Sequence, residues 1–174
     1  MRLLNSWVLF SATFGTLGIA VAQNPEPTQK QPVTTLNIST VQESVKVGSP
    51  VRIRVILKNI SDHDIVVGRE VGGMDCRIDV RDAHGKLVAD TKLGYFRNGH
   101  VANLDLSRIS PQDLTGNAYY GTLRPGETSK WELDAAKLYD IKQSGSYAIQ
   151  VDRRDPENLS TFVNSNTITV KATP

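Results

Sequence analysis

Apolar and polar side chains alternate along most of the chain after residue 32, and this two-residue period is typical of half-buried β-strands. The clearest case is residues 51–58, where every second residue is apolar and most of the residues between them are charged. One face of this predicted strand should enter a core while the other meets water. The apolar set is Val51, Ile53, Val55 and Leu57, and the opposite set includes Arg52, Arg54 and Lys58.

Shorter stretches with the same alternation follow, separated by residues that favour turns. Glycine, proline, asparagine and aspartate gather between them, as in Arg124-Pro125-Gly126-Glu127. Seven to nine short strands at this spacing predict an all-β fold, an antiparallel immunoglobulin-like β-sandwich. A small closed barrel fits the same pattern and stays open as an alternative. The further predicted strands lie at residues 34–39, 65–67, 76–82, 87–89, 130–133, 145–151 and 167–170.

Two regions interrupt the strand pattern. Residues 135–139 have the composition of one helical turn that crosses between strands. Residues 93–121 form a connection far longer than a hairpin needs, and connections of this length usually carry a function or partial disorder.

The first 22 residues predict export. Arg2 gives a basic start, residues 3–19 are uncharged and mostly apolar, and Ala20-Val21-Ala22 matches the small-residue pattern read by signal peptidase. Polar residues interrupt the apolar stretch and no basic cluster follows it, which argues against a permanent membrane span. We therefore expect a cleaved signal peptide (1–22), a flexible proline-rich leader (23–32) and one secreted or periplasmic immunoglobulin-like domain (33–174) with no membrane span.

Charge and cysteine content narrow the partners and the chemistry. The net charge is +2, and loss of Arg2 with the signal peptide leaves +2 − 1 = +1. Such a near-neutral chain with interspersed charges predicts neither nucleic acid nor an anionic membrane as partner. Cys76 is the single cysteine, so no intrachain disulfide can form. We expect it to be a small buried residue in a strand; a thiol that pairs between chains or acts as a nucleophile is the alternative.

Several stretches resemble a known family. They are residues 55–62, with a hydrophobic strand followed by Asn59-Ile60-Ser61-Asp62, and residues 78–88, 123–128 and 145–151. Their order is similar to that of BsuPI-type proteinase-inhibitor domains and of β-domains that precede some deuterolysin-like peptidases. The resemblance covers roughly residues 45–152 and implies an immunoglobulin-like fold. Its motifs are those that any such sandwich needs, so no inhibitory residue is carried over.

Two acidic clusters are candidates for metal binding, because carboxylates suit hard cations and histidine suits transition metals. Neither cluster has the ligand spacing of a known metal site, so an Asx-type turn and a solvated salt-bridge patch are the expected roles. We predict no metal and no cofactor. Nucleophile motifs are absent as well, so we do not expect an enzyme. The clusters are Asp62-His63-Asp64, and Asp152, Asp155 and Glu157.

Three Asn-x-Ser sequons occur, at Asn37, Asn59 and Asn158. They matter only if the source glycosylates exported proteins.

The long connection gives the main functional hypothesis. It is rich in aromatic side chains and arginine, which concentrate binding energy at interfaces, and aromatic rings also stack on sugars. Alternatively, these rings fold back and close one open end of the sandwich. The predicted binding residues are Tyr95, Phe96, Arg97, Tyr119 and Tyr120.

The favoured interpretation is an exported, non-enzymatic binding or accessory module that presents loops to a protein or glycan partner. Two alternatives stay open. One is a secreted protease inhibitor that exposes Arg97 or Tyr119-Tyr120 on an extended loop. The other is a purely structural accessory domain of the cell envelope, which would use the strand edges of an open sandwich.

Overall fold

The computed structural model describes residues 31–68, 76–98 and 120–174. The predicted signal peptide, almost all of the leader, and Tyr119 with most of the long connection lie outside these residues. None of the described helices is long and apolar enough to cross a membrane.

The described residues form ten strands and two helices. The strands are β1 (Thr34–Thr40), β2 (Ser44–Lys46), β3 (Arg52–Asn59), β4 (Ile65–Gly68), β5 (Cys76–Arg81), β6 (Tyr120–Leu123), β7 (Thr128–Asp134), β8 (Gly145–Arg154), β9 (Phe162–Asn164) and β10 (Ile168–Thr173). The helices are α1 (Lys92–Arg97) and α3 (Ala135–Leu138).

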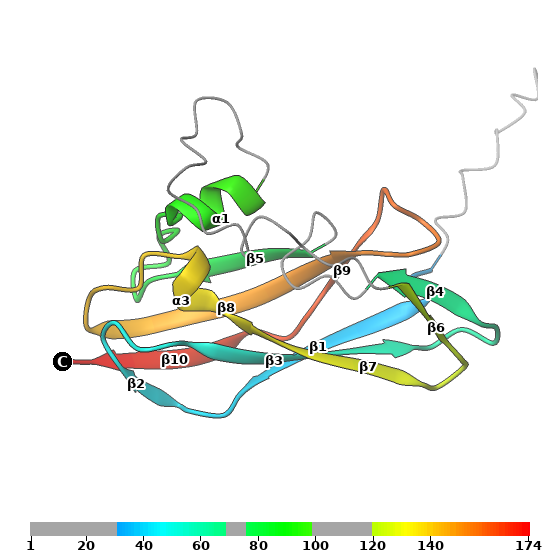
Figure 1. Cartoon of the computed structure of the whole chain (residues 1–174), viewed down its shortest axis with the longest axis horizontal. Helices are drawn as coiled ribbons and strands as arrows, with labels where there is room; N and C mark the ends of the chain where they lie inside the picture. Colours follow the sequence, from blue (N-terminus) through cyan, green and yellow to red (C-terminus); the bar gives the residue numbers. More distant parts are fainter. Residues whose placement is uncertain (1–30, 69–75, 99–119) are drawn as a thin grey trace, which may run out of the picture.

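The strands form two stacked sheets and a separate two-stranded ribbon (Figure 1). One sheet has the order β1-β3-β7, the other has the order β2-β10-β8-β5 with β9 paired to β8, and β4 pairs with β6 in the ribbon. The all-β prediction is confirmed. Ten strands are present in the described residues rather than seven to nine, because β2 and β9 are three residues long and too short to show a period. Residues 87–89 contribute only an isolated bridge between Leu87 and Arg81.

The N-terminal strand segment switches from one sheet to the other. β1 runs antiparallel to β3, whereas β2 runs parallel to β10 in the opposite sheet. The backbone N–H of Val47 extends this parallel pairing by donating to the carbonyl of Thr173. Strands that change sheets in this way join the two layers of a sandwich at their edge.

The core lies between the two sheets, and the alternation in β3 supplies its most deeply buried residues on that side. Ile53, Val55 and Leu57 have no exposed surface, and they belong to the same buried cluster as Ile149 and Val151 of β8. Full burial of each such side chain contributes about 1.5–3 kcal/mol. This apolar layer stabilises the domain without a disulfide, since Cys76 is the single cysteine.

Asn59 ends β3 and is completely buried. Its Nδ2 group donates to the carbonyls of His63 (2.8 Å) and Leu123 (2.9 Å), and its Oδ1 accepts from the backbone N–H (2.8 Å) and hydroxyl (2.7 Å) of Ser61. Its own backbone pairs with residues of the β6–β7 turn. The Asx turn predicted after β3 is therefore present. A glycan cannot attach to Asn59 in the folded domain, because its amide is enclosed.

A second buried polar contact marks the start of β8. Tyr147 is 6% exposed, and its hydroxyl donates to the carbonyl of Gln143, four residues upstream, at 2.8 Å. A tyrosine that bonds back to the chain before this strand is the tyrosine corner of immunoglobulin-like sandwiches. The contact fixes the corner between the two sheets and, with the sheet switch of β1 and β2, defines the fold as immunoglobulin-like.

One cation is buried at the far end of the same strand. Arg153 is 4% exposed, donates to the carbonyl of Gly68, and lies over the ring of Trp131 at 5.4 Å. Its guanidinium is 3.9 Å from the sulfur of Cys76, which is half-buried in β5. Cys76 is thus a strand residue, as predicted, although it is only partly buried.

Replacement of Asn59 with alanine should lower the free energy of unfolding by about 3 kcal/mol, since it leaves the buried carbonyl of Leu123 without its donor and opens a cavity. Asn37→Ala is the matched control, because Asn37 is an exposed residue of β1, and it should cost less than about 0.5 kcal/mol. Urea unfolding of both variants measures the difference. Equal effects would contradict the role assigned to Asn59.

Candidate functional site

The predicted binding connection begins with a helix docked against the domain. Thr91 caps α1: its side chain accepts from the backbone N–H of Gly94 at 3.0 Å. The backbone N–H of Thr91 donates to the carbonyl of Leu138 (2.9 Å), and its hydroxyl donates to the carbonyl of Lys137 (2.6 Å). Both acceptors are carbonyls of the last turn of α3, which have no partner within that helix. The N-cap of α1 therefore supplies the hydrogen-bond donors that the end of α3 lacks. The helical turn predicted at residues 135–139 is confirmed as α3.

Gly94 permits this docking. It is buried in α1, and a Cβ atom at this position would lie 1.9 Å from the carbonyl oxygen of Leu138. The constraint is therefore a close approach of two backbones, which only glycine allows. The first part of the long connection is a fixed platform on α3.

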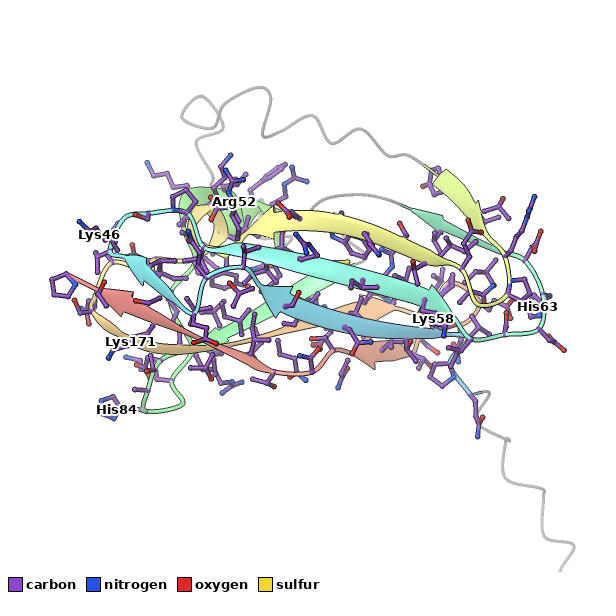
Figure 2. All side chains as sticks on the ribbon, turned by 90° about the horizontal axis from the view of Figure 1, so that it is seen from below. Lys46, Arg52, Lys58, His63, His84 and Lys171 are labelled. Atoms are coloured by element: carbon purple, nitrogen blue, oxygen red, sulfur yellow. The ribbon has the colours of Figure 1, made fainter. Side chains whose placement is uncertain are left out.

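The predicted binding residues do not all lie together. Tyr95 is 41% exposed on α1, and Phe96 and Arg97 on the same helix are half-buried. Tyr120 is 75% exposed at the start of β6. Figures 1 and 2 place α1 and β6 toward opposite ends of the sandwich. Tyr120 is therefore separated from the three residues on α1, and Tyr119 lies outside the described residues. The binding role of these residues stays a prediction.

A groove of about 590 Å³ lies between β5 and the C-terminal end of α1. This volume is in the range of small-ligand sites. Charged and polar groups from four regions of the chain meet in it. Those groups are Arg77 and Asp79 of β5, Asp90, Arg97 and Asn98 of α1 and its flanks, and Tyr139 and Asp152.

Two of the three carboxylates in the groove have partners. Asp79 forms an ion pair with Arg81 at 2.8 Å, and Asp90 accepts from the side-chain amide of Asn98 at 2.9 Å. Asp152 differs: its Oδ1 is buried and has no hydrogen-bond partner among the described residues. Burial raises the pKa of the Asp152 carboxyl, with a further contribution from the charge of Asp79. A buried acceptor without a donor is costly unless a ligand supplies one.

Tyr139 forms part of the groove wall. It is 6% exposed, and its hydroxyl donates to the carbonyl of Ile78 in β5. Burial raises the pKa of the phenol, so it remains a neutral donor over the physiological range. It therefore fixes the distance between α3 and β5, on which the width of the groove depends.

Asp79, Asp90, Asn98 and Tyr139 were not predicted as site residues. The alternation in the sequence places Asp79 on the outer face of a strand. No sequence pattern indicates that residues 90–98 pack over that face. The contacts between α1 and α3 place them there.

The two acidic clusters of the sequence touch through His63 and Glu157, away from the groove that holds Asp152. His63 contacts Asp62 through Nδ1 at 2.9 Å and Glu157 through Nε2. These carboxylates lie on opposite sides of the ring and do not converge. No group of three metal-ligating side chains is present in the described residues. Asp155 has a structural role: it is buried and accepts from the backbone N–H groups of Val33, Glu157 and Asn158.

No protein-family model matches the sequence, and no curated protein matches it. The resemblance to BsuPI-type domains is thus not confirmed. Solved structures with a similar fold include the CARDB domain of a Pyrococcus furiosus protein in complex with di-metal ions, which is 14% identical with a TM-score of 0.39 over 82% of this chain and 89% of that one.

Two further solved structures are similar. A β-glucosidase from Listeria innocua in complex with gluconolactone is 11% identical with a TM-score of 0.39; the match covers 81% of this chain but 16% of that enzyme. A PapD-like domain of human CEP192 is 14% identical with a TM-score of 0.27, over 89% of this chain and 94% of that one. These are likenesses of fold, and no function follows from them.

Replacement of Gly94 with alanine should displace α1 from α3, because the new methyl group meets the backbone of Leu138. Such overpacking costs about 1–3 kcal/mol. Amide hydrogen exchange should accelerate at Tyr95 and Asn98, whose N–H groups donate within α1. Lys92→Ala, on the exposed side of the helix, should leave exchange unchanged. Unaltered protection in Gly94→Ala would refute the proposed docking.

The His63 contacts should make stability depend on pH. Hydrogen bonds to Glu157 and Asp62 raise the pKa of His63 above its ordinary value, and the bond from His63 lowers the pKa of Asp62. The histidine contribution is full below its ordinary pKa and disappears as pH rises through the raised pKa; the Asp62 contribution disappears as pH falls through the lowered one. His63→Gln should therefore destabilise the domain more at about pH 5.5 than at about pH 8.5. Urea unfolding at both values measures this, and equal losses would contradict it.

Proposed function

We propose that this chain is an exported, non-enzymatic binding module that engages a protein or glycan partner at the groove between β5 and α1. The observation that carries the proposal is the groove itself, with a buried Asp152 oxygen that has no partner among the described residues. A hydroxyl or amide of a ligand would satisfy that oxygen.

The chemistry of the groove suits a polar partner. Carboxylates accept from hydroxyl or N–H groups, while Asn98 and the two arginines Arg77 and Arg97 can donate. Tyr95 is exposed on the same helix as Arg97 and offers an aromatic ring to solvent. Such a mixture of aromatic and hydrogen-bonding side chains is typical of binding surfaces for sugars and for polar segments of proteins.

The rigidity of the platform supports binding as well. α1 is capped by Thr91, fixed to α3 by two hydrogen bonds and held close by Gly94. A preorganised surface loses less conformational entropy when a partner binds. The inhibitor alternative exposes Arg97 on an extended loop, whereas Arg97 is half-buried in the helix α1. Binding is therefore the better-supported function.

Variants at the two ends of the domain test the proposal. Tyr95→Ala and Asp152→Asn should each weaken capture of the partner from the exported proteins and glycans of the source cells by about tenfold or more. Tyr120→Ala is the matched control, because it removes an even more exposed ring from β6. Affinities are measured on the full chain by surface plasmon resonance, with circular dichroism as the check on folding. Loss of binding in Tyr120→Ala alone would move the site to the other end of the domain.

A further inference from the structure

The outer face of the β1-β3-β7 sheet carries a row of cations. Arg52, Arg54 and Lys58 all point outward from β3, and each is exposed. The outward position between the last two is Ile56, and Lys130 of β7 lies directly beside it in the register of the sheet. Figure 2 views this sheet from its outer side, with Arg52 and Lys58 labelled toward the two ends of β3.

The spacing of this row is regular. Outward residues of one strand are two positions apart, or about 6.7 Å, so Arg52 and Lys58 are separated by about 20 Å. Lys130 fills the one missing step from the neighbouring strand. At the edge of the sandwich next to Arg52, Lys46 of β2 in the other sheet lines a hollow of about 790 Å³ together with Arg52 and Arg54.

Few acids balance the four cations on this face of the described sheet, Arg52, Arg54, Lys58 and Lys130. Glu132 pairs with Arg54 at 3.4 Å, and both side chains are about half exposed, so this pair is weak. Asp134 lies opposite Arg52, but its Oδ1 accepts from the backbone N–H groups of Val51 and Ala136. In the described structure Arg52, Lys58 and Lys130 have no ion pair. Like charges on one sheet face repel, and an external anion relieves that repulsion.

We propose that this sheet face binds a linear anionic polysaccharide along β3. A single straight row of cations suits one extended chain of negative charges. The row on β1 beside it supplies hydroxyl and amide groups, at Thr35, Asn37 and Ser39, which can bond sugar hydroxyls. No aromatic side chain stands on this face of the three strands, so it lacks the stacking platforms that bind single-stranded nucleic acid.

The surface is distinct from the groove at α1, and its test does not depend on the proposed function. A heparin octasaccharide serves as the probe, in titration calorimetry on the full chain at several salt concentrations. Arg52→Thr/Lys58→Thr/Lys130→Thr should lower the affinity at least about tenfold and reduce the salt slope by about one per cation removed. Lys86→Thr/Lys92→Thr/Lys171→Thr has the same net charge as this variant and should retain binding.

A gain of affinity provides a second, opposite test. Glu132→Gln removes the acid that pairs with Arg54 and should tighten heparin binding by about threefold. Unchanged or weaker binding in this variant, an equal loss in the matched lysine control, or no binding of wild-type protein at low salt would each overturn the proposal. Tighter binding of a 12-base-pair DNA duplex than of heparin would overturn the choice of a polysaccharide.

Discussion

The amide of Asn59 is the contact on which the arrangement of the β4-β6 ribbon depends. It bonds the turn after β3 on one side and the last residue of β6 on the other. Both N–H groups of Nδ2 donate and both lone pairs of Oδ1 accept, so every hydrogen-bonding position of the side chain is used. A buried amide with this many partners tolerates one geometry only. The hydrophobic layer under β3 would hold two sheets together in several registers, and Asn59 selects one by linking the β3–β4 turn to Leu123.

The same principle recurs wherever the sandwich must be closed without a disulfide. Asp155 fixes the start of β1 through the backbone of Val33, and Tyr147 fixes the corner before β8. Arg153 fills the end of the core between Gly68 and Trp131. Apolar burial supplies most of the stabilising free energy, but it is not directional. Buried polar side chains give the ends of the domain a defined geometry. One of them, Tyr139, sets the width of the groove at α1 through its hydrogen bond to β5.

The core was predictable because it depends on a period that a single sequence displays. Val51 to Leu57 alternates except at Ile56, and the structure buries the residues that this pattern selects. The site was less predictable because it depends on contacts between distant segments. Tyr95 and Tyr120 belong to one aromatic-rich connection in the sequence, yet α1 and β6 carry them to opposite ends. The role of Gly94 could not be predicted from the sequence either. Glycine is recognised in a sequence mainly at turns, whereas Gly94 is required here because the backbone of Leu138 packs against it.

The cationic face shows how a near-neutral chain can still carry a strong local charge. Along the sequence, Arg52, Arg54 and Lys58 alternate with apolar residues, and acids elsewhere reduce the net charge to +2. Folding removes the apolar residues from the surface, and it places Lys130 beside the one outward position of β3 that lacks a cation. The acids lie mainly in turns and caps, where backbone N–H groups bind them, as Asp134 and Asp155 show. The net charge of the chain therefore does not predict whether one of its faces attracts anions. That attraction depends on the local electrostatic potential, which acts over about one Debye length, ~10 Å.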